Sequence, residues 1–185
     1  MRRISYYYRT KAEFEQYYFR LKQASCPHCK QVGFLIRHGY LPVSYEEHGT
    51  SKKSRGRRIY CSNRKLRNGC GKTFSAISSA ILKGFIISSP TLWMILTKRI
   101  QGLNLKKSFD QAGLSFSTSW IYWIWHKWRI NQSRLRTFFY SLKTGSFSYQ
   151  NVCAEIETIL YLKAVFPTPN PIASFQACFQ QPLFQ

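Results

Sequence analysis

Four of the six cysteines in this 185-residue chain have a spacing that can bind a metal ion. Cys26 and Cys29 form a CPHC motif, and Cys61 and Cys70 follow after a longer gap, the latter within GCGKTF. Two thiols separated by two residues can wrap one tetrahedral cation, with the amides of a tight turn pointing at the sulfurs. Four thiolates suit Zn²⁺, with iron a chemically feasible substitute. We therefore expect a structural zinc site with all four as ligands.

Other interpretations of the cysteines and histidines stay open at this point. CPHC is also the spacing of a thioredoxin-like redox pair, although no βαβ pattern surrounds it, and the four thiols could be unrelated core residues. Histidine binds zinc as well as cysteine does, so three histidines are alternative candidates for a ligand position. These are His28, His38 and His48. Cys153 and Cys178 lie in apolar segments and are expected to be buried without a metal.

The residues between Cys61 and Cys70 are too many for a compact turn. The segment SNRKLRNG must therefore bulge out as a loop, and a metal bound at its base would hold a basic loop in place. Gly71 is expected to give the backbone room and Phe74 to cover the metal. The cations of this loop are Arg64, Lys65 and Arg67.

The charge balance indicates polyanionic partners. The chain has 28 Lys and Arg against 7 Asp and Glu, a formal net charge of +21. Residues 1–75 hold 17 of these cations and only four acids, so the polyanion-facing surface is expected mainly there. Nucleic acid is the first candidate and an anionic membrane surface the second.

A membrane partner is not expected. The sequence has no run of about 18 apolar residues, the length that a spanning helix needs. Its basic beginning, MRRISYYYRT, is not followed by the apolar core of a signal peptide. We therefore expect a cytoplasmic, nucleoid-associated protein, in which thiols stay reduced and clustered cysteines hold metal more often than they form disulfides.

The acidic residues argue against an enzyme. Asp110 is the one aspartate, and the six glutamates stand in short local pairs. Two-metal phosphoryl transfer on nucleic acid needs several carboxylates that converge on the ions. No pairing of a nucleophile with a base stands out from the abundant Ser and Tyr residues. We expect no catalytic site.

The pattern predicts an α+β chain in four segments. Residues 1–24 form a basic aromatic arm and a helix, which begins at the capping-box sequence TKAE. Residues 25–79 contain short strand-like runs and a polar loop, EEHGTSKKSRG, and are expected to form a zinc ribbon of short antiparallel strands. Residues 80–145 are expected to be an all-α helix-turn-helix region. Residues 146–185 contain a C-terminal helix and a Pro/Gln/Phe-rich tail.

Local signals set the expected helix boundaries in the second half. Ser89 is the expected N-cap of the first helix, with Pro90 at its first position and Gly102 as its stop. A short helix then ends at Gly113, and a longer one begins at Ser117. Two further helices are expected over residues 134–143 and 151–165.

The helix that begins at Ser117 has an apolar stripe at helical spacing. The stripe consists of Ile121, Ile124, Trp125 and Trp128. A recognition helix usually presents Arg, Asn, Gln or Ser to base edges, whereas the outward positions here are mostly aromatic. The tryptophans therefore contact bases, pack under the C-terminal helices, or pack in a homodimer.

The order of these motifs resembles the N-terminal region of bacterial insertion-sequence transposases. The residues that carry the likeness are CPHC, a strand-rich insert, RGRRIYCSN, GCGKTFS, SPTLW and the helix-turn-helix pattern, over roughly residues 25–130. In that family a zinc ribbon precedes a helix-turn-helix and the pair binds the ends of the element. The carboxylate-bearing catalytic domain of those transposases has no counterpart here.

The resemblance implies that the four cysteines are zinc ligands and that nearby cations face DNA. The implied cations of the ribbon are Arg55, Arg57, Arg58, Arg64, Lys65, Arg67 and Lys72. We add Lys106, Lys107 and Lys127 of the helical region to the predicted nucleic-acid-binding set.

We expect a zinc-dependent protein that binds duplex DNA, an accessory or regulatory factor related to mobile-element transposases. An alternative is an RNA or single-strand binder, because the many aromatic residues could stack on unpaired bases beside a basic groove. Another is an adaptor in a nucleoprotein complex that docks a protein partner through residues 145–185.

Overall fold

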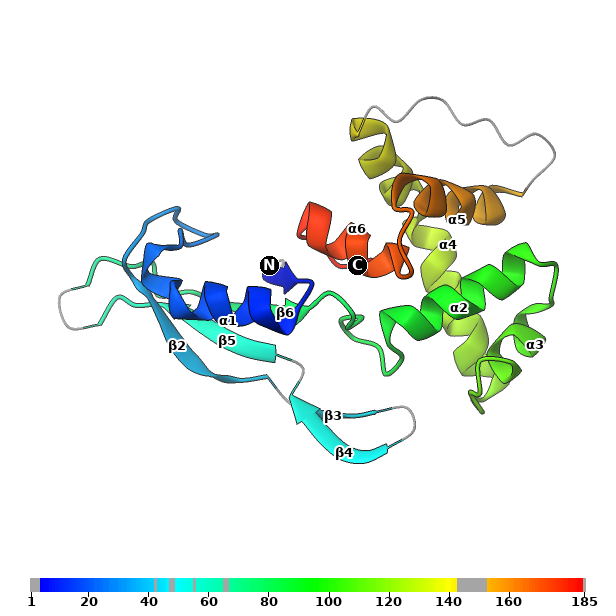
Figure 1. Ribbon diagram of the computed structural model, residues 1–185, viewed down its shortest axis with the longest axis horizontal. Helices are drawn as coiled ribbons and strands as arrows, with labels where there is room; N and C mark the ends of the chain where they lie inside the picture. Colours follow the sequence, from blue (N-terminus) through cyan, green and yellow to red (C-terminus); the bar gives the residue numbers. More distant parts are fainter. Residues whose placement is uncertain are drawn as a thin grey trace. The chain divides into compact units, whose positions relative to one another are not determined.

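The computed structural model describes residues 4–41, 43–46, 49–54, 56–64, 67–142 and 153–184. The chain divides into two compact units, Met1–Ile81 and Leu82–Gln185. Within the described residues it is an α+β protein with a four-stranded mixed sheet, a two-stranded sheet and six α-helices (Figure 1). The α+β class predicted from the sequence is thereby confirmed.

The sheet of the first unit has the strand order β1-β6-β5-β2. The strands are β1 (Ser5–Tyr8), β2 (Leu35–Tyr40), β5 (Gly56–Cys61) and β6 (Thr73–Ser78). Strand β5 is antiparallel to both of its neighbours, whereas β1 pairs with β6 in parallel. Within residues 25–79 the strand pairs are antiparallel, as expected, and the parallel pair arises because the aromatic arm adds β1 to the edge of the sheet.

A second, two-stranded sheet contains β3 (Val43–Glu46) and β4 (Gly49–Ser54), which are antiparallel. Most of this segment was expected to be a polar loop, because its Lys and Gly residues have low strand propensity. Pairing between the two strands outweighs that local preference.

Helix α1 (Lys11–Phe19) covers one face of the four-stranded sheet, and a 3₁₀ turn, η1 (Leu21–Gln23), follows it (Figure 1). Its start confirms the predicted cap, since the side chain of Thr10 accepts a hydrogen bond from the Glu13 amide. Phe14 and Tyr17 of α1 pack against a buried cluster. That cluster consists of Leu21, Cys26, Leu35, Ile59, Cys61, Phe74 and Ala76.

The described part of the second unit is helical. Its helices are α2 (Ser89–Ile100), α3 (Leu105–Asp110), α4 (Thr118–Ser141), α5 (Ala154–Val165) and α6 (Pro171–Phe179). Ser117 caps α4 as predicted, accepting a hydrogen bond from the Trp120 amide. The cap of α2 is Ser88 and not Ser89, because the Thr91 amide donates to the Ser88 hydroxyl.

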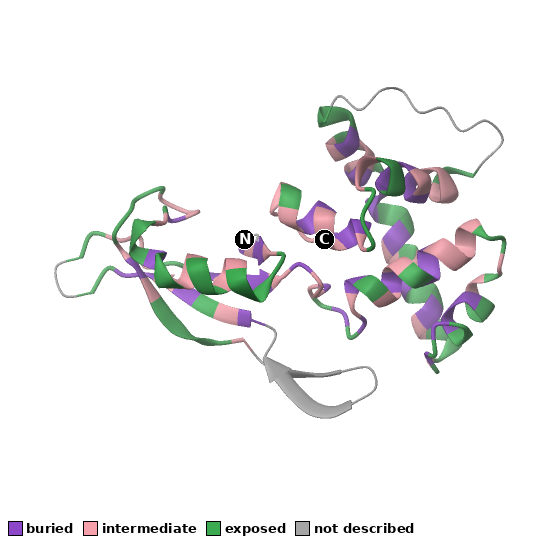
Figure 2. Cartoon of the chain, viewed as in Figure 1, coloured by how far each residue is buried: buried purple, intermediate pink, exposed green. Residues whose placement is uncertain are grey.

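Two helical features of this unit differ from the predictions. Residues 134–141 continue α4 and do not form a separate helix. The tail contains a helix, α6, because Asn170 caps it and Pro171 occupies the first turn, where its missing N–H costs no hydrogen bond. Ile172 and Phe175 of α6 are fully buried in a core that also contains Trp128 of α4. Figure 2 shows buried positions along both helices.

Among the helices that the structure describes, none has the length and apolar character needed to cross a membrane.

Candidate metal centre

The first cysteine pair lies in a tight turn between η1 and β2. Two backbone hydrogen bonds close this turn, since the Cys26 amide donates to the Gln31 carbonyl and the Lys30 amide donates to the Cys26 carbonyl, each at 2.8 Å. Lys30, directly after Cys29, has a left-handed backbone with a φ of 63°. The left-handed residue reverses the chain, so that Ser25 before the turn pairs with Val32 after it in an antiparallel bridge.

The second pair lies at the ends of two neighbouring strands. Cys61 is the last residue of β5, and Cys70 precedes β6. The Cys61 amide donates to the Lys72 carbonyl at 2.9 Å, and the Gly71 amide donates to the Cys61 carbonyl at 3.0 Å. Gly71 has a φ of 69°, so both pairs are followed by a left-handed residue. The two turns therefore have the same local geometry despite their different sequences.

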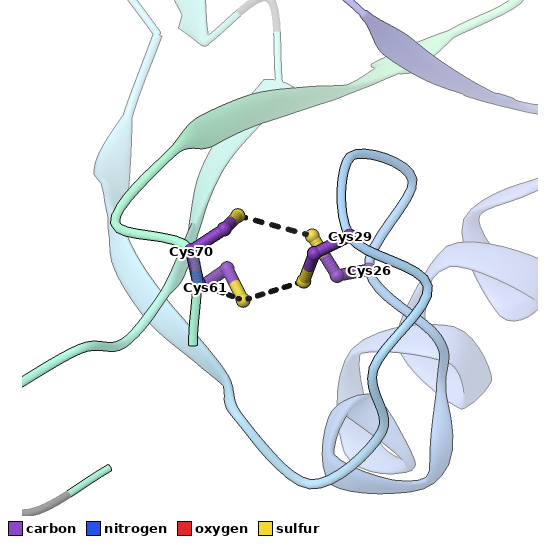
Figure 3. Close-up of side chains that lie close together, drawn as sticks. All are labelled: Cys26, Cys29, Cys61 and Cys70. Carbon is purple, nitrogen blue, oxygen red and sulfur yellow. Dashed lines mark hydrogen bonds between the residues drawn. The ribbon is translucent and has the colours of Figure 1, made fainter. Parts of the chain in front are cut away.

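The four Sγ atoms converge on one point, and all lie within 4.8 Å of one another (Figure 3). Cys26 lies 3.8 Å from Cys70, and Cys29 lies 3.7 Å from Cys61, sulfur to sulfur. A tetrahedral ion with metal–sulfur bonds of about 2.3 Å has sulfur–sulfur edges of about 3.8 Å. The structure thus brings together the four cysteines singled out by the sequence, at distances that suit one tetrahedral ion.

Backbone amides point at the sulfurs. The His28 amide donates to Cys26 Sγ at 3.4 Å. The Cys70 amide donates to Cys61 Sγ at 3.3 Å (Figure 3). Gln31 and Lys72 provide backbone donors to the remaining two sulfurs, those of Cys29 and Cys70. Every sulfur in the cluster therefore has a local hydrogen-bond donor. Such hydrogen bonds stabilise the negative charge of a thiolate.

The thiols differ in acidity without a metal. The backbone hydrogen bond from Gln31 lowers the pKa of Cys29 to about 7. Burial raises the pKa of Cys61 to about 12 and also raises the pKa of Cys70. A bound cation requires the thiolate form, so metal binding must displace protons from these last two thiols.

The other candidate ligands that the structure describes lie outside the cluster. His28 places its Nε2 3.3 Å from the Thr73 carbonyl oxygen, and exposed His38 packs against the Tyr60 ring. His48 falls outside the described residues. Cys153 and Cys178 are exposed, so the prediction that they are buried was wrong. Cys153 is the N-cap residue of α5, and Cys178 lies off the buried face of α6.

The loop between Cys61 and Cys70 is closed at its base. The Gly69 amide donates to the Ser62 carbonyl at 3.0 Å, and each of these two residues is the direct neighbour of a cysteine of the cluster. Arg64 and Arg67 in this loop are exposed, and the Arg64 guanidinium lies 5.5 Å from the Tyr60 ring centroid. Lys65 is not among the described residues.

The remaining predicted cations that the structure describes in the first unit lie on the sheet or beside it. Arg58 and Lys72 are exposed. Arg57 is half-buried, with its guanidinium 3.4 Å from the Tyr40 ring centroid. Arg55 is not among the described residues.

The predicted cations of the second unit lie on α3 and α4. Lys106 and Lys107 are exposed, and Lys127 Nζ lies 5.9 Å from the Trp123 ring. Tyr122 and Trp123 are exposed, so the outward face of α4 is aromatic near its start. Of the predicted apolar stripe, Ile121, Ile124 and Trp128 are buried, whereas Trp125 is half-buried against the same core.

The acidic residues at the start of α5 connect it to α4. Glu155 and Glu157 lie in the first turn of α5 and form ion pairs with Arg129 and Arg136 of α4.

Among the described residues, the four cysteines are the one group of His, Cys, Asp or Glu side chains that could share a metal ion.

No protein-family model matches the chain, and neither a curated protein nor a solved structure matches it. The capacity to hold a metal therefore rests on the four sulfurs, their distances and their amide donors.

Proposed function

We propose that the four-cysteine cluster holds a structural zinc ion, and that the first unit is a zinc ribbon that binds duplex DNA through the basic loop between Cys61 and Cys70. The observation that carries this proposal is the tetrahedral spacing of four sulfurs at the base of that loop.

Zinc is the metal that this donor set favours. Four thiolates leave no coordination position open for water or substrate, which is typical of structural sites and not of catalytic ones. Soft thiolate ligands in a tetrahedral arrangement select zinc or iron over magnesium, calcium or manganese. Cys26 and Cys61 belong to the buried cluster beneath α1, so the ion would stabilise the sheet and its covering helix together.

Charge supports DNA as the partner. In the described part of the first unit, Lys11 and Glu15 form an ion pair, whereas no carboxylate pairs with the exposed cations around the metal centre. Those cations are Arg58, Arg64, Arg67 and Lys72. Unpaired surface cations contact phosphates, which dominate the affinity of proteins for DNA and carry little sequence information.

The helical unit supports a second contact. A short helix, α3, leads through buried Ala112 and Leu114 to the capped start of α4, the order of elements in a helix-turn-helix. With the resemblance of the motif order to insertion-sequence transposases, we propose an accessory or regulatory factor related to mobile elements. The adaptor alternative has less support, since the apolar residues Ile172, Phe175 and Phe184 of the tail are buried in their own unit.

Fluorescence anisotropy of labelled duplex DNA tests the proposal. The zinc-loaded protein, the chelated protein and the variants Arg64→Gln and Arg67→Gln are each titrated over a series of salt concentrations. Removal of one phosphate-binding cation should make the slope of log affinity against log salt shallower by about 0.9. Lys163→Gln on α5 removes one exposed charge outside the predicted set and should leave the slope unchanged. Chelation without effect, together with unchanged slopes in both variants, would refute the proposal.

A further inference from the structure

A groove in the first unit lies between the end of α1, the turn η1 and the edge strand β2. It has a volume of about 420 Å³, within the range of about 300–1,000 Å³ that is usual for small-ligand sites. Its lining residues are Tyr18, Phe19, Arg20, Leu21, Lys22, Gln23, Leu35, Ile36 and Arg37. Neither the metal centre nor the basic loop contributes to it.

Phe19 lies at this groove with most of its surface open to solvent. It is the last residue of α1 and is 86% exposed, the largest exposed fraction among the large apolar residues that the structure describes. Two other aromatic residues of α1 pack against β1, as Tyr17 stacks on Tyr6 and Phe14 packs on Tyr8. An exposed phenyl ring loses nothing by accepting a planar partner, and stacking would remove its apolar face from water.

Cations line the same groove as Phe19. Arg20 and Lys22 follow Phe19 along the chain and are exposed, and Arg37 lines the opposite wall on β2. The Arg37 guanidinium lies 4.5 Å from the centroid of the Tyr18 ring, an arrangement that orients it by cation–π attraction.

A second guanidinium shares that ring. Arg57 lies 5.8 Å from the Tyr18 centroid and 3.4 Å from the Tyr40 centroid. Two like charges are therefore held near one aromatic side chain, at a cost that a bound anion would offset.

No carboxylate neutralises these cations within the described residues. The two glutamates of α1 are already engaged, since Glu13 accepts from the Arg9 amide and the Tyr6 hydroxyl, and Glu15 pairs with Lys11. The last carbonyls of α1 carry a partial negative charge, which the nearby Arg20 and Lys22 side chains outweigh. The groove is thus complementary to an anion that also has an aromatic face.

We propose that this groove binds one unpaired nucleotide of a single-stranded segment, with its base stacked on Phe19 and its phosphodiester between Arg20, Lys22 and Arg37. A single strand fits these features, because its bases expose both faces, whereas the bases of a duplex are stacked on their neighbours. The proposal rests on the proposed function in that nucleic acid is the ligand of this protein. It adds a second site, which prefers a single strand to a duplex.

The test compares a fluorescent oligothymidylate of about twelve nucleotides, within the usual site size of single-strand binders, with a duplex of mixed sequence, using the full-length, zinc-loaded protein. Phe19→Leu removes the aromatic face and keeps the apolar bulk, and Arg37→Gln removes a groove charge. Tyr140→Leu, at an exposed aromatic residue in the last turn of α4, and Lys163→Gln are the matched controls. Loss of one base stack should weaken oligothymidylate binding by at least about five-fold. Duplex binding by Phe19→Leu should change by less than about two-fold.

The outcomes separate this site from the basic loop. If duplex binds in a metal-dependent manner and Phe19→Leu binds oligothymidylate like the wild type, the groove is not a base-stacking site, although the proposed function stands. If oligothymidylate binding needs Phe19 and duplex does not bind, the groove stands and the duplex proposal fails. Equal losses for both nucleic acids in Phe19→Leu would overturn the single-strand assignment. Displacement of the oligonucleotide by an equal concentration of thymidine monophosphate would contradict the claim that the groove binds a nucleotide within a strand.

Discussion

The backbone amide of Cys70 donates a hydrogen bond to the Sγ of Cys61 at 3.3 Å. The two residues are nine positions apart in the chain, yet this contact has the same role as the one from the His28 amide to Cys26 in the CPHC turn. The long loop therefore leaves the metal centre undisturbed, because its two ends are bonded to each other beside the sulfurs. The Cys61 and Cys70 pair therefore resembles the CPHC turn in its hydrogen bonding, with a basic loop inserted between the two cysteines.

Replacement of one ligand should change the metal's coordination without unfolding the second unit. Cobalt(II) bound by four thiolates in a tetrahedron has intense visible absorption, and Cys61→Ser should weaken and shift those bands. Cys178→Ser, a change at an exposed cysteine, should leave the spectrum and the one-to-one stoichiometry unchanged. A wild-type spectrum from Cys61→Ser would contradict the assignment of this residue as a ligand.

Gly69 has no room for a side chain. A Cβ at this position would lie 2.3 Å from the Ser62 carbonyl oxygen and 2.9 Å from Cys61 Sγ. Gly69→Ala should therefore push the loop base away from the sulfur and lower the free energy of unfolding of the metal-loaded first unit by about 1–3 kcal/mol.

The neighbouring exposed residue provides the control, since Asn68→Ala should change the free energy of unfolding by less than about 0.5 kcal/mol. Chemical denaturation followed by tyrosine fluorescence, alongside a metal competition titration, measures both variants, since all five tryptophans lie in the second unit. Equal free energies of unfolding for Gly69→Ala and Asn68→Ala would show that the base of the loop can shift without loss of stability.

The sequence predicts those features that depend on short-range chemistry. The CPHC turn, the Thr10 cap of α1 and the Ser117 cap of α4 follow from residue types a few positions apart, and the structure contains all three. The spacing of Cys61 and Cys70 also pointed to a shared site, because free thiols near a CPHC motif have few other roles.

Features that depend on distant partners were not predictable. A run of four residues in the arm becomes strand β1 only because β6 lies beside it, and the strand propensity of its tyrosines alone does not set that pairing. The tail helix α6 is stabilised by burial of Ile172 and Phe175, which outweighs the prolines that suggested an irregular tail. The groove at Phe19 combines residues from α1 and β2, and no sequence pattern joins them.

Lys30 occupies a backbone conformation that costs energy for any residue with a side chain. Its φ of 63° matches the 69° of Gly71, which follows the second pair of cysteines. The left-handed conformation costs a non-glycine residue about 1–2 kcal/mol, and glycine's extra freedom in the unfolded chain cancels about 0.5–1 kcal/mol of that difference. Lys30→Gly should therefore leave the metal-loaded protein as stable as the wild type or up to about 1 kcal/mol more stable.

The opposite change provides the contrast. Lys30→Val, whose branched side chain disfavours a positive φ, should be destabilising in the same denaturation experiment. A loss of stability in Lys30→Gly would mean that the lysine side chain makes a contact worth more than the strain.

Arg136 joins α4 to α5 by several contacts. Its Nε donates to the Thr158 hydroxyl at 3.0 Å, one terminal nitrogen donates to the Ala154 carbonyl at 2.7 Å, and the same group pairs with Glu157. Arg136→Met should lower the free energy of unfolding of the second unit by about 1–3 kcal/mol, because these partners would be left without a charged donor.

Arg129 is the matched control, since it is mostly exposed and forms an ion pair with Glu155. Arg129→Gln should cost less than about 1 kcal/mol, as is usual for surface pairs. Thermal unfolding monitored by tryptophan fluorescence compares the two, and a larger effect at Arg129 would contradict this description of the α4–α5 contact.

Metal affinity should rise with pH, and the slope should report how many protons the thiols release when the metal binds. Burial raises the pKa values of Cys61 and Cys70, so both are protonated near neutral pH and must release protons when a metal binds. Since the pKa of Cys29 is lowered to about 7, this thiol adds to the proton release below pH 7 and no longer does so above it. The logarithm of the apparent zinc affinity should therefore increase by at least two per pH unit above pH 7 and more steeply below it. Calorimetric titration in buffers of different ionisation enthalpy counts the released protons, and an affinity independent of pH would contradict coordination by these thiolates.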